Sequence, residues 1–195
     1  MEVGEVFANP RTGAMMEVTA WPQIALPGKL QIRRVFRPGM GFRVPHVHLS
    51  LDETFCVEYG VADIRIGHRS GRLCAGQQFR VPRYEVHVNP LNRSTNDLVF
   101  LQTFEAARFD GAKRYVETLA KFLTEERDVL GDLPPLVAAA VFAGKYEQTF
   151  ATRLPQVLQR RVVFPLAKSY EERREERRSL RAAGVAAGDD NWADW

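Results

Sequence analysis

The sequence predicts a mainly β protein, a barrel or sandwich of short strands followed by a helical C-terminal part. Up to about residue 105, short runs rich in β-branched and aromatic residues alternate with Gly, Pro and Asn, which is typical of closely spaced strands. Beyond that point, apolar residues recur at three- and four-residue spacings, which indicates helices. We therefore expect a β domain over 1–105 and a helical extension over 106–195 that packs on it.

The strands and helices are expected between turn-forming residues. The expected strands are 30–36, 53–59, 62–67, 78–81, 85–88 and 98–104. An apolar stripe predicts a first helix over 113–130, which Gly131 and two prolines end. The stripe consists of Val116, Leu119, Ala120, Phe122 and Leu123. Further helices are expected over 136–150 and 155–164, then a solvated charged run over 169–181 and a flexible tail that contains Trp192 and Trp195.

Composition and charge exclude several functional classes. The 27 basic and 24 acidic residues give a net charge of only +3, without a clustered basic face, which argues against nucleic-acid binding. No apolar run approaches the roughly 20 residues of a membrane span, and no leader pattern is present, so we expect a cytoplasmic protein. Cys56 and Cys74 fit no zinc or disulfide pattern and are expected to be reduced and buried.

The residues that carry chemistry are three of the four histidines and one glutamate. His46 and His48 are two apart, so on a strand both imidazoles project from the same face. Glu53 follows after four residues, enough for a turn that brings the next strand back, and His87 lies in a separate strand. Such a donor set suits Fe(II), Mn(II), Ni(II), Cu(II) or Zn(II) better than Ca(II) or Mg(II). His68, between Gly67 and Gly71, is expected in an exposed turn.

These residues resemble the two motifs of the cupins, small β-barrels of the jelly-roll type. The segment HVHLSLDETFCVEYG matches the first motif through HxH, Glu53 and the closing Gly60. Gly76, Pro82 and His87 match the second, but Tyr84 stands where the family has a glycine, and Asn89 is two residues after His87 where the motif places its Asn at four, so we expect an altered turn. The opening and the helical third are similar to a bacterial single-domain subgroup.

The resemblance implies a cupin-type jelly-roll β-barrel with one divalent transition metal per chain, for which Fe(II) is favoured. His46, His48, Glu53 and His87 would be the ligands. Two coordination positions would remain for substrate or dioxygen. We expect a dioxygenase-type oxidoreductase. A metal-dependent isomerase, cyclase or decarboxylase and a non-catalytic small-molecule-binding protein remain open.

A substrate and a second subunit complete these expectations. Phenylalanines on or beside the strands favour a hydrophobic or aromatic small molecule. Phe55, Phe79, Tyr84 and Gln102 are the candidate substrate-binding residues, and Glu53 could also act as a catalytic base. A homodimer is expected at the level of the family, since edge strands need covering.

Overall fold

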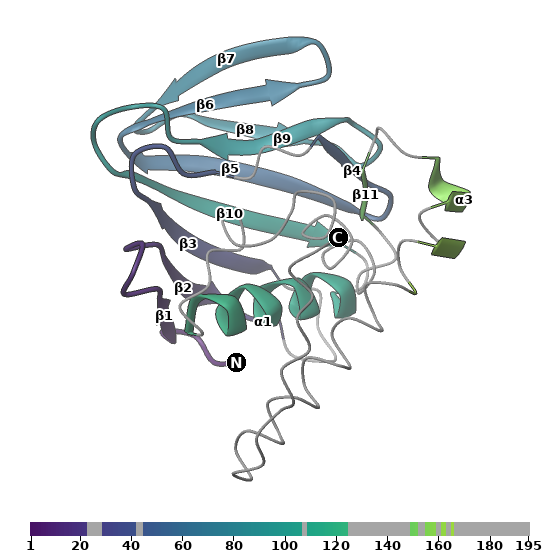
Figure 1. The fold of residues 1–195 in the computed structure, drawn as a ribbon, viewed down its shortest axis with the longest axis horizontal. Helices are drawn as coiled ribbons and strands as arrows, with labels where there is room; N and C mark the ends of the chain where they lie inside the picture. The colour runs from purple at the N-terminus through teal and green to yellow at the C-terminus, as the bar shows by residue number, and fades with distance from the viewer. Residues whose placement is uncertain are drawn as a thin grey trace, which may run out of the picture.

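The computed structural model describes residues 1–22, 29–41, 45–106, 109–124, 149–151, 155–158, 161–162 and 165. About half of them lie in two antiparallel sheets (Figure 1). The first has six strands in the order β1 (Val6–Ala8), β2 (Met15–Ala20), β3 (Leu30–Phe36), β10 (Leu98–Ala106), β5 (Leu51–Tyr59) and β8 (Gln78–Val81). The second has five, in the order β11 (Thr149–Ala151), β4 (His46–His48), β9 (His87–Leu91), β6 (Val61–Ile66) and β7 (Arg69–Cys74). This two-sheet arrangement confirms the predicted jelly roll.

The inner face of the six-stranded sheet follows from strict alternation along its strands. In β3, buried and half-buried residues alternate over all seven positions, so Leu30, Ile32, Arg34 and Phe36 share the inner face. The antiparallel register sets Ile32 opposite Gln102 of β10, which places Gln102 on the same face. The inner face is therefore mostly apolar, with a few polar side chains at fixed positions.

Two hydrophobic clusters hold the fold together. The first lies between the two sheets, and its fully buried members include Phe55 and Phe100. The second packs the helix α1 (Asp110–Thr124) against residues of β2, β3 and β10, among them Met16 and Ile32. Figure 1 shows α1 running beside β1, β2 and β3. The helix thus covers the part of the inner face that the five-stranded sheet does not.

The predicted helical extension is confirmed in part. Within α1, Val116, Leu119 and Ala120 are buried, as the stripe predicts, although the helix already begins at Asp110. Residues 125–148 lie outside the described residues, as do the charged run and the tail. The helix expected to reach residue 150 is wrong at its end, because Thr149–Ala151 pair as β11 with β4. Part of the third segment is helical, as α3 (Gln156–Leu158).

Two turns join neighbouring strands, and the first of them contains the closing glycine of the first sequence motif. Gly60 ends β5 with a positive φ of 83°, and a Cβ there would lie 2.3 Å from the Asp97 carbonyl oxygen. Only glycine fits that position without displacing backbone. The next turn joins β6 to β7, an unpredicted strand, and leaves His68 exposed, as predicted.

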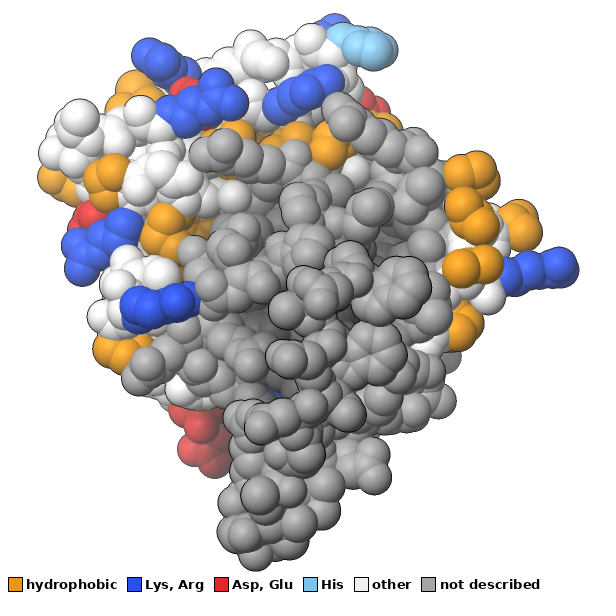
Figure 2. Space-filling view, in the orientation of Figure 1, with side chains coloured by type: hydrophobic (Ala, Val, Ile, Leu, Met, Phe, Trp, Pro, Cys, Tyr) orange, Lys and Arg blue, Asp and Glu red, His pale blue; other side chains and the backbone are white. Residues whose placement is uncertain are grey.

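The surface over β6 and β7 carries several basic side chains, which are arginines in these two strands (Figure 2). Asp63 offsets part of this charge, with a carboxylate oxygen 3.0 Å from Arg72 Nε and the other 3.5 Å from Arg93 Nε. Cys56 and Cys74 are both free thiols, as predicted. Their expected burial is wrong, because Cys56 is only half-buried and Cys74 is exposed on the edge strand β7. In the described residues, no helix has the length and apolar character needed to cross a membrane.

Candidate metal centre

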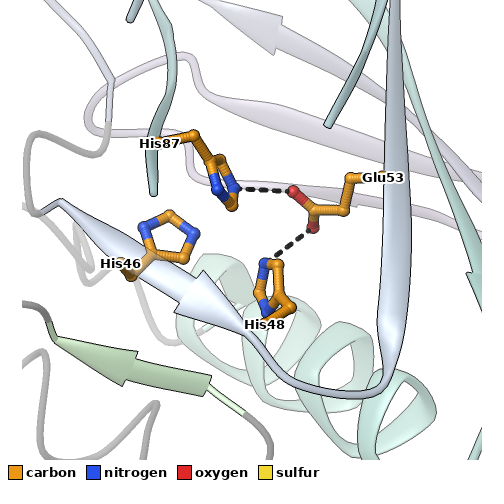
Figure 3. Close-up of side chains that lie close together, drawn as sticks. All are labelled: His46, His48, Glu53 and His87. Atoms are coloured by element: carbon orange, nitrogen blue, oxygen red, sulfur yellow. Dashed lines mark hydrogen bonds and ion pairs between the residues drawn. The ribbon is translucent and has the colours of Figure 1, made fainter. Parts of the chain in front are cut away.

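The four residues that the motif singles out converge from three strands. His46 and His48 lie on β4 and project from the same face, because they are two positions apart. Glu53 lies on β5 of the opposite sheet, and His87 begins β9, where it is the register partner of His46. Figure 3 shows the four side chains pointing toward one another between the sheets.

The cluster is compact and buried. One ligand atom from each residue lies within 4.8 Å of the others, and all four residues are buried. The ring centroids of His46 and His87 are 4.2 Å apart, and those of His46 and His48 are 5.0 Å apart. Divalent transition-metal ions bind imidazole nitrogen and carboxylate oxygen at about 2.0–2.2 Å, so four donors this close can surround a single cation. A His-His-Glu-His cluster that could hold a metal is therefore present.

The orientation of His87 also fits a cation. Its Nδ1 lies 3.2 Å from the carbonyl oxygen of Glu85, which can only accept a hydrogen bond, so Nδ1 carries the proton in the neutral ring. The other ring nitrogen, Nε2, lies 3.1 Å from Glu53 Oε2. A proton shared between the two atoms, or a metal ion bound to both, would hold them together at this distance.

Glu53 is held as a carboxylate at the centre of the cluster. Burial alone would raise the pKa of Glu53, but His48 and then His87 outweigh it and hold that pKa well below its usual range. His48 Nε2 lies 3.4 Å from Oε1 (Figure 3). Gln102 donates a hydrogen bond from Nε2 to the same oxygen at 3.1 Å. The carboxylate therefore has a fixed orientation and a negative charge, as a metal ligand needs.

The turn before His87 shows how the chain compensates for the departure from the second motif. Tyr84 adopts a φ of 69°, the left-handed conformation that glycine favours. Its backbone N–H donates to the His48 carbonyl at 2.7 Å, and the Asp52 carboxylate accepts from the Arg83 backbone N–H at 2.8 Å. These two bonds tie the turn to β4 and β5, so His87 reaches the cluster without the glycine.

The other predicted site residues have different surroundings. Gln102 is fully buried and contacts the cluster through Glu53. Phe55 and Phe79 stack on each other in the core between the sheets, with ring centroids 5.1 Å apart. Tyr84 is 67% exposed at its turn. The structure thus brings Gln102 to the cluster and not Tyr84, and the substrate-binding roles stay predictions.

Two residues that the sequence reasoning missed lie next to the cluster. Arg34 is buried on the inner face of β3, with its NH1 nitrogen 3.4 Å from Gln102 Oε1. The Tyr115 hydroxyl of α1 lies near Gln102 and Arg34, and burial raises the pKa of Tyr115, so it stays protonated. The alternation of QIRRVF was the available signal, because it sets Arg34 in the same row as Leu30, Ile32 and Phe36.

Comparisons with known proteins find similar solved structures only. No family model matches the chain, and no curated protein matches it. KdgF from Halomonas sp. has 20% identity and a TM-score of 0.44 over 53% of this chain and 90% of that one. An RmlC-like cupin from Shewanella frigidimarina has 17% identity and a TM-score of 0.42 over 53% of this chain and 86% of that one. A predicted oxalate decarboxylase from Thermotoga maritima has 20% identity and a TM-score of 0.42 over 53% of this chain and 92% of that one.

Proposed function

We propose, on the premise that this chain has the cupin fold, that it is a metal-dependent enzyme acting on a small organic molecule, and that its reaction is of the dioxygenase type. The observation that supports the proposal most is the buried cluster of three histidines and one glutamate. A barrel that only binds an apolar ligand has no need to bury four such groups, since burying polar and charged groups without partners is costly.

His46, His48, Glu53 and His87 would hold the metal, which we propose to be a divalent transition ion, with Fe(II) first among the candidates. When bound, Fe(II) would supply the redox chemistry that dioxygen requires, and any divalent ion would polarise a carbonyl group as a Lewis acid. Four protein donors leave part of an octahedral shell for adjacent oxygen atoms of a substrate.

The chain's own residues would set the geometry of the reaction. The Glu85 carbonyl fixes the ring of His87, and Gln102 fixes one oxygen of Glu53. Glu53 is the group placed to hold or accept a proton beside the substrate, because it is the buried carboxylate of the cluster. The stacked rings of Phe55 and Phe79 lie in the same barrel and support a substrate with an apolar or aromatic body.

The test is turnover of metal-loaded protein with a panel of small chelating compounds, followed by oxygen electrode and mass spectrometry. We expect oxygen consumption that requires the metal and a product that contains added oxygen. A Glu53→Gln variant should keep its fold and lose this turnover. Metal-dependent turnover that proceeds equally without dioxygen would replace the oxygenase by an isomerase, cyclase or decarboxylase.

A control separates the cluster from the rest of the surface. His68→Ala changes the described histidine that lies outside the cluster, at the exposed turn between β6 and β7. Its turnover should equal that of the unaltered protein. If His68→Ala and His87→Ala reduce turnover equally, the cluster is not the active site.

A further inference from the structure

The feature that the proposed metal centre leaves unexplained is a buried cation in the barrel. Arg34 is 8% exposed, on the inner face of β3. Its guanidinium carbon lies 4.5 Å from the ring centroid of Phe36 and 5.9 Å from that of Phe100. In the part of the chain that the structure describes, no carboxylate forms an ion pair with it. Buried charges are normally paired, so this one calls for a partner.

The hydrogen-bond partners of Arg34 are neutral. A guanidinium carries five N–H donors, and among the described residues Gln102 accepts from one of them at 3.4 Å, with the Tyr115 hydroxyl nearby. The rings of Phe36 and Phe100 stabilise the cation through their faces but accept no hydrogen bond in its plane. The fork of donors therefore has unused capacity for a planar anion.

Arg34 is also connected to one candidate metal ligand, Glu53, through Gln102. Gln102 accepts from Arg34 through Oε1 and donates through Nε2 to Glu53 Oε1. Two hydrogen bonds thus separate the guanidinium from the cluster. Tyr115 closes the group from α1, where its ring packs edge-on against Phe104 at 5.8 Å. One small molecule could reach both Arg34 and the metal.

We propose that Arg34, with Gln102 and Tyr115, forms the anion-binding subsite of the centre and that the substrate is a small organic acid whose carboxylate it binds. This inference rests on the proposed function, because the end of the substrate away from its carboxylate would contact the metal. It favours a carboxylate over a phosphate, because one guanidinium with a neutral amide and a neutral hydroxyl matches a single negative charge. The aromatic rings around Arg34 suit an apolar body on that acid.

The test measures binding by calorimetry and thermal shift, so it needs no turnover. The probes are acetate, benzoate and pyruvate, with benzamide as the neutral match of benzoate and inorganic phosphate as the other anion. We expect at least one carboxylate to bind the full chain, with benzamide and phosphate binding at least about tenfold more weakly. Arg34→Met should weaken carboxylate binding by about tenfold or more and keep the metal, since Met fills the same apolar space.

The matched control is Arg33→Met, one residue earlier, whose side chain lies on the outer face and pairs with Glu17 and Glu58. It should bind the carboxylate like the unaltered protein. Arg34→Lys serves if Arg34→Met fails to fold, because it keeps the charge and loses the fork. The proposal is overturned if no carboxylate binds, if benzamide or phosphate binds as well as the carboxylates, or if binding survives both Arg34 variants.

Metal content, measured on the same samples, separates the two proposals. Metal without carboxylate binding leaves the metal centre standing and removes the subsite. Carboxylate binding that depends on Arg34 in a protein that takes up no metal supports the subsite and removes the metal-dependent function.

Discussion

Arg33 and Arg34 are neighbours in β3, but they lie on opposite faces of the six-stranded sheet and in opposite electrostatic situations. On the outer face, Arg33 Nε is 2.7 Å from Glu58, and its NH1 is 2.5 Å from Glu17. Hydrogen bonds that Arg33 donates to Glu58 and then to Glu17 raise the pKa of Arg33. On the inner face, Arg34 has aromatic rings, an amide and a hydroxyl around it. The outer charges satisfy one another, whereas the inner guanidinium has only aromatic and neutral polar neighbours among the described residues.

The largest expected effect concerns the cluster of His46, His48, Glu53 and His87 between the two sheets. A divalent metal ion at about one hundred times its Kd should raise the free energy of unfolding by about 2.7 kcal/mol, because it binds only the folded state. His87→Ala should abolish most of this gain, since it removes one of four donors. Thermal unfolding with and without added metal measures both values.

His68→Ala is the matched control for that measurement. Its imidazole is exposed at the β6–β7 turn, so the metal-induced gain should remain complete. An equal gain in His87→Ala and the unaltered protein would place the metal elsewhere.

The next largest effect is expected at Asp52, a buried residue of β5. Burial alone would raise the pKa of Asp52, but the backbone and side-chain hydrogen bonds from Arg83, followed by Arg80, outweigh it and lower that pKa. A carboxyl with a lowered pKa stabilises the fold above its unfolded pKa, about 3.9, and that contribution is lost as pH falls through the folded pKa. Asp52→Asn should therefore cost about 1–2 kcal/mol at neutral pH and progressively less in acid. Urea unfolding of this variant and of the unaltered protein at neutral and at acid pH measures the cost. An equal cost at the two pH values would contradict this expectation.

A smaller effect is expected at the turn that delivers His87. Tyr84 has a φ of 69°, where a β-branched residue is strained by about 1 kcal/mol or more. Tyr84→Val should lower stability by about that amount, whereas Tyr84→Gly should be close to neutral, since glycine relieves strain but adds entropy to the unfolded chain. Chemical denaturation of both variants measures the difference. Equal stabilities would show that the turn relaxes to another conformation.

The smallest effect is expected on the outer face. The Arg33 side chain is 35% exposed, so water and salt screen its pairs with Glu17 and Glu58. Arg33→Ala should cost less than about 1 kcal/mol and less still in high salt. Denaturation at low and high salt gives both numbers. A larger, salt-independent loss would show that the two faces are not as different as Arg33 and Arg34 suggest.

The metal-ligand candidates could be predicted because their information is local. Two histidines at positions i and i+2 share a face on any strand, and the gap to Glu53 allows only a short return. Alternation likewise located β3 and β8 at their observed bounds, 30–36 and 78–81. Where one face is buried, the sequence carries a period of two that can be read directly.

The features that could not be predicted depend on contacts between distant parts of the chain. Strand β7, RSGRLC, is an edge strand with mostly exposed residues, so it lacks an alternating pattern. Strand β11 is short and forms by pairing with β4, more than a hundred residues earlier in the chain. Tyr115 directly precedes the apolar stripe of α1 and lies near Arg34 only because α1 packs on the sheet.

Elemental analysis of the protein purified without chelators tests whether the four converging side chains hold a metal ion. We expect close to one transition-metal ion per chain, lost in His46→Ala and His87→Ala while both variants stay folded. Unaltered protein that contains no metal, and whose thermal unfolding does not change when Fe(II), Mn(II), Ni(II), Cu(II) or Zn(II) is added, would contradict it.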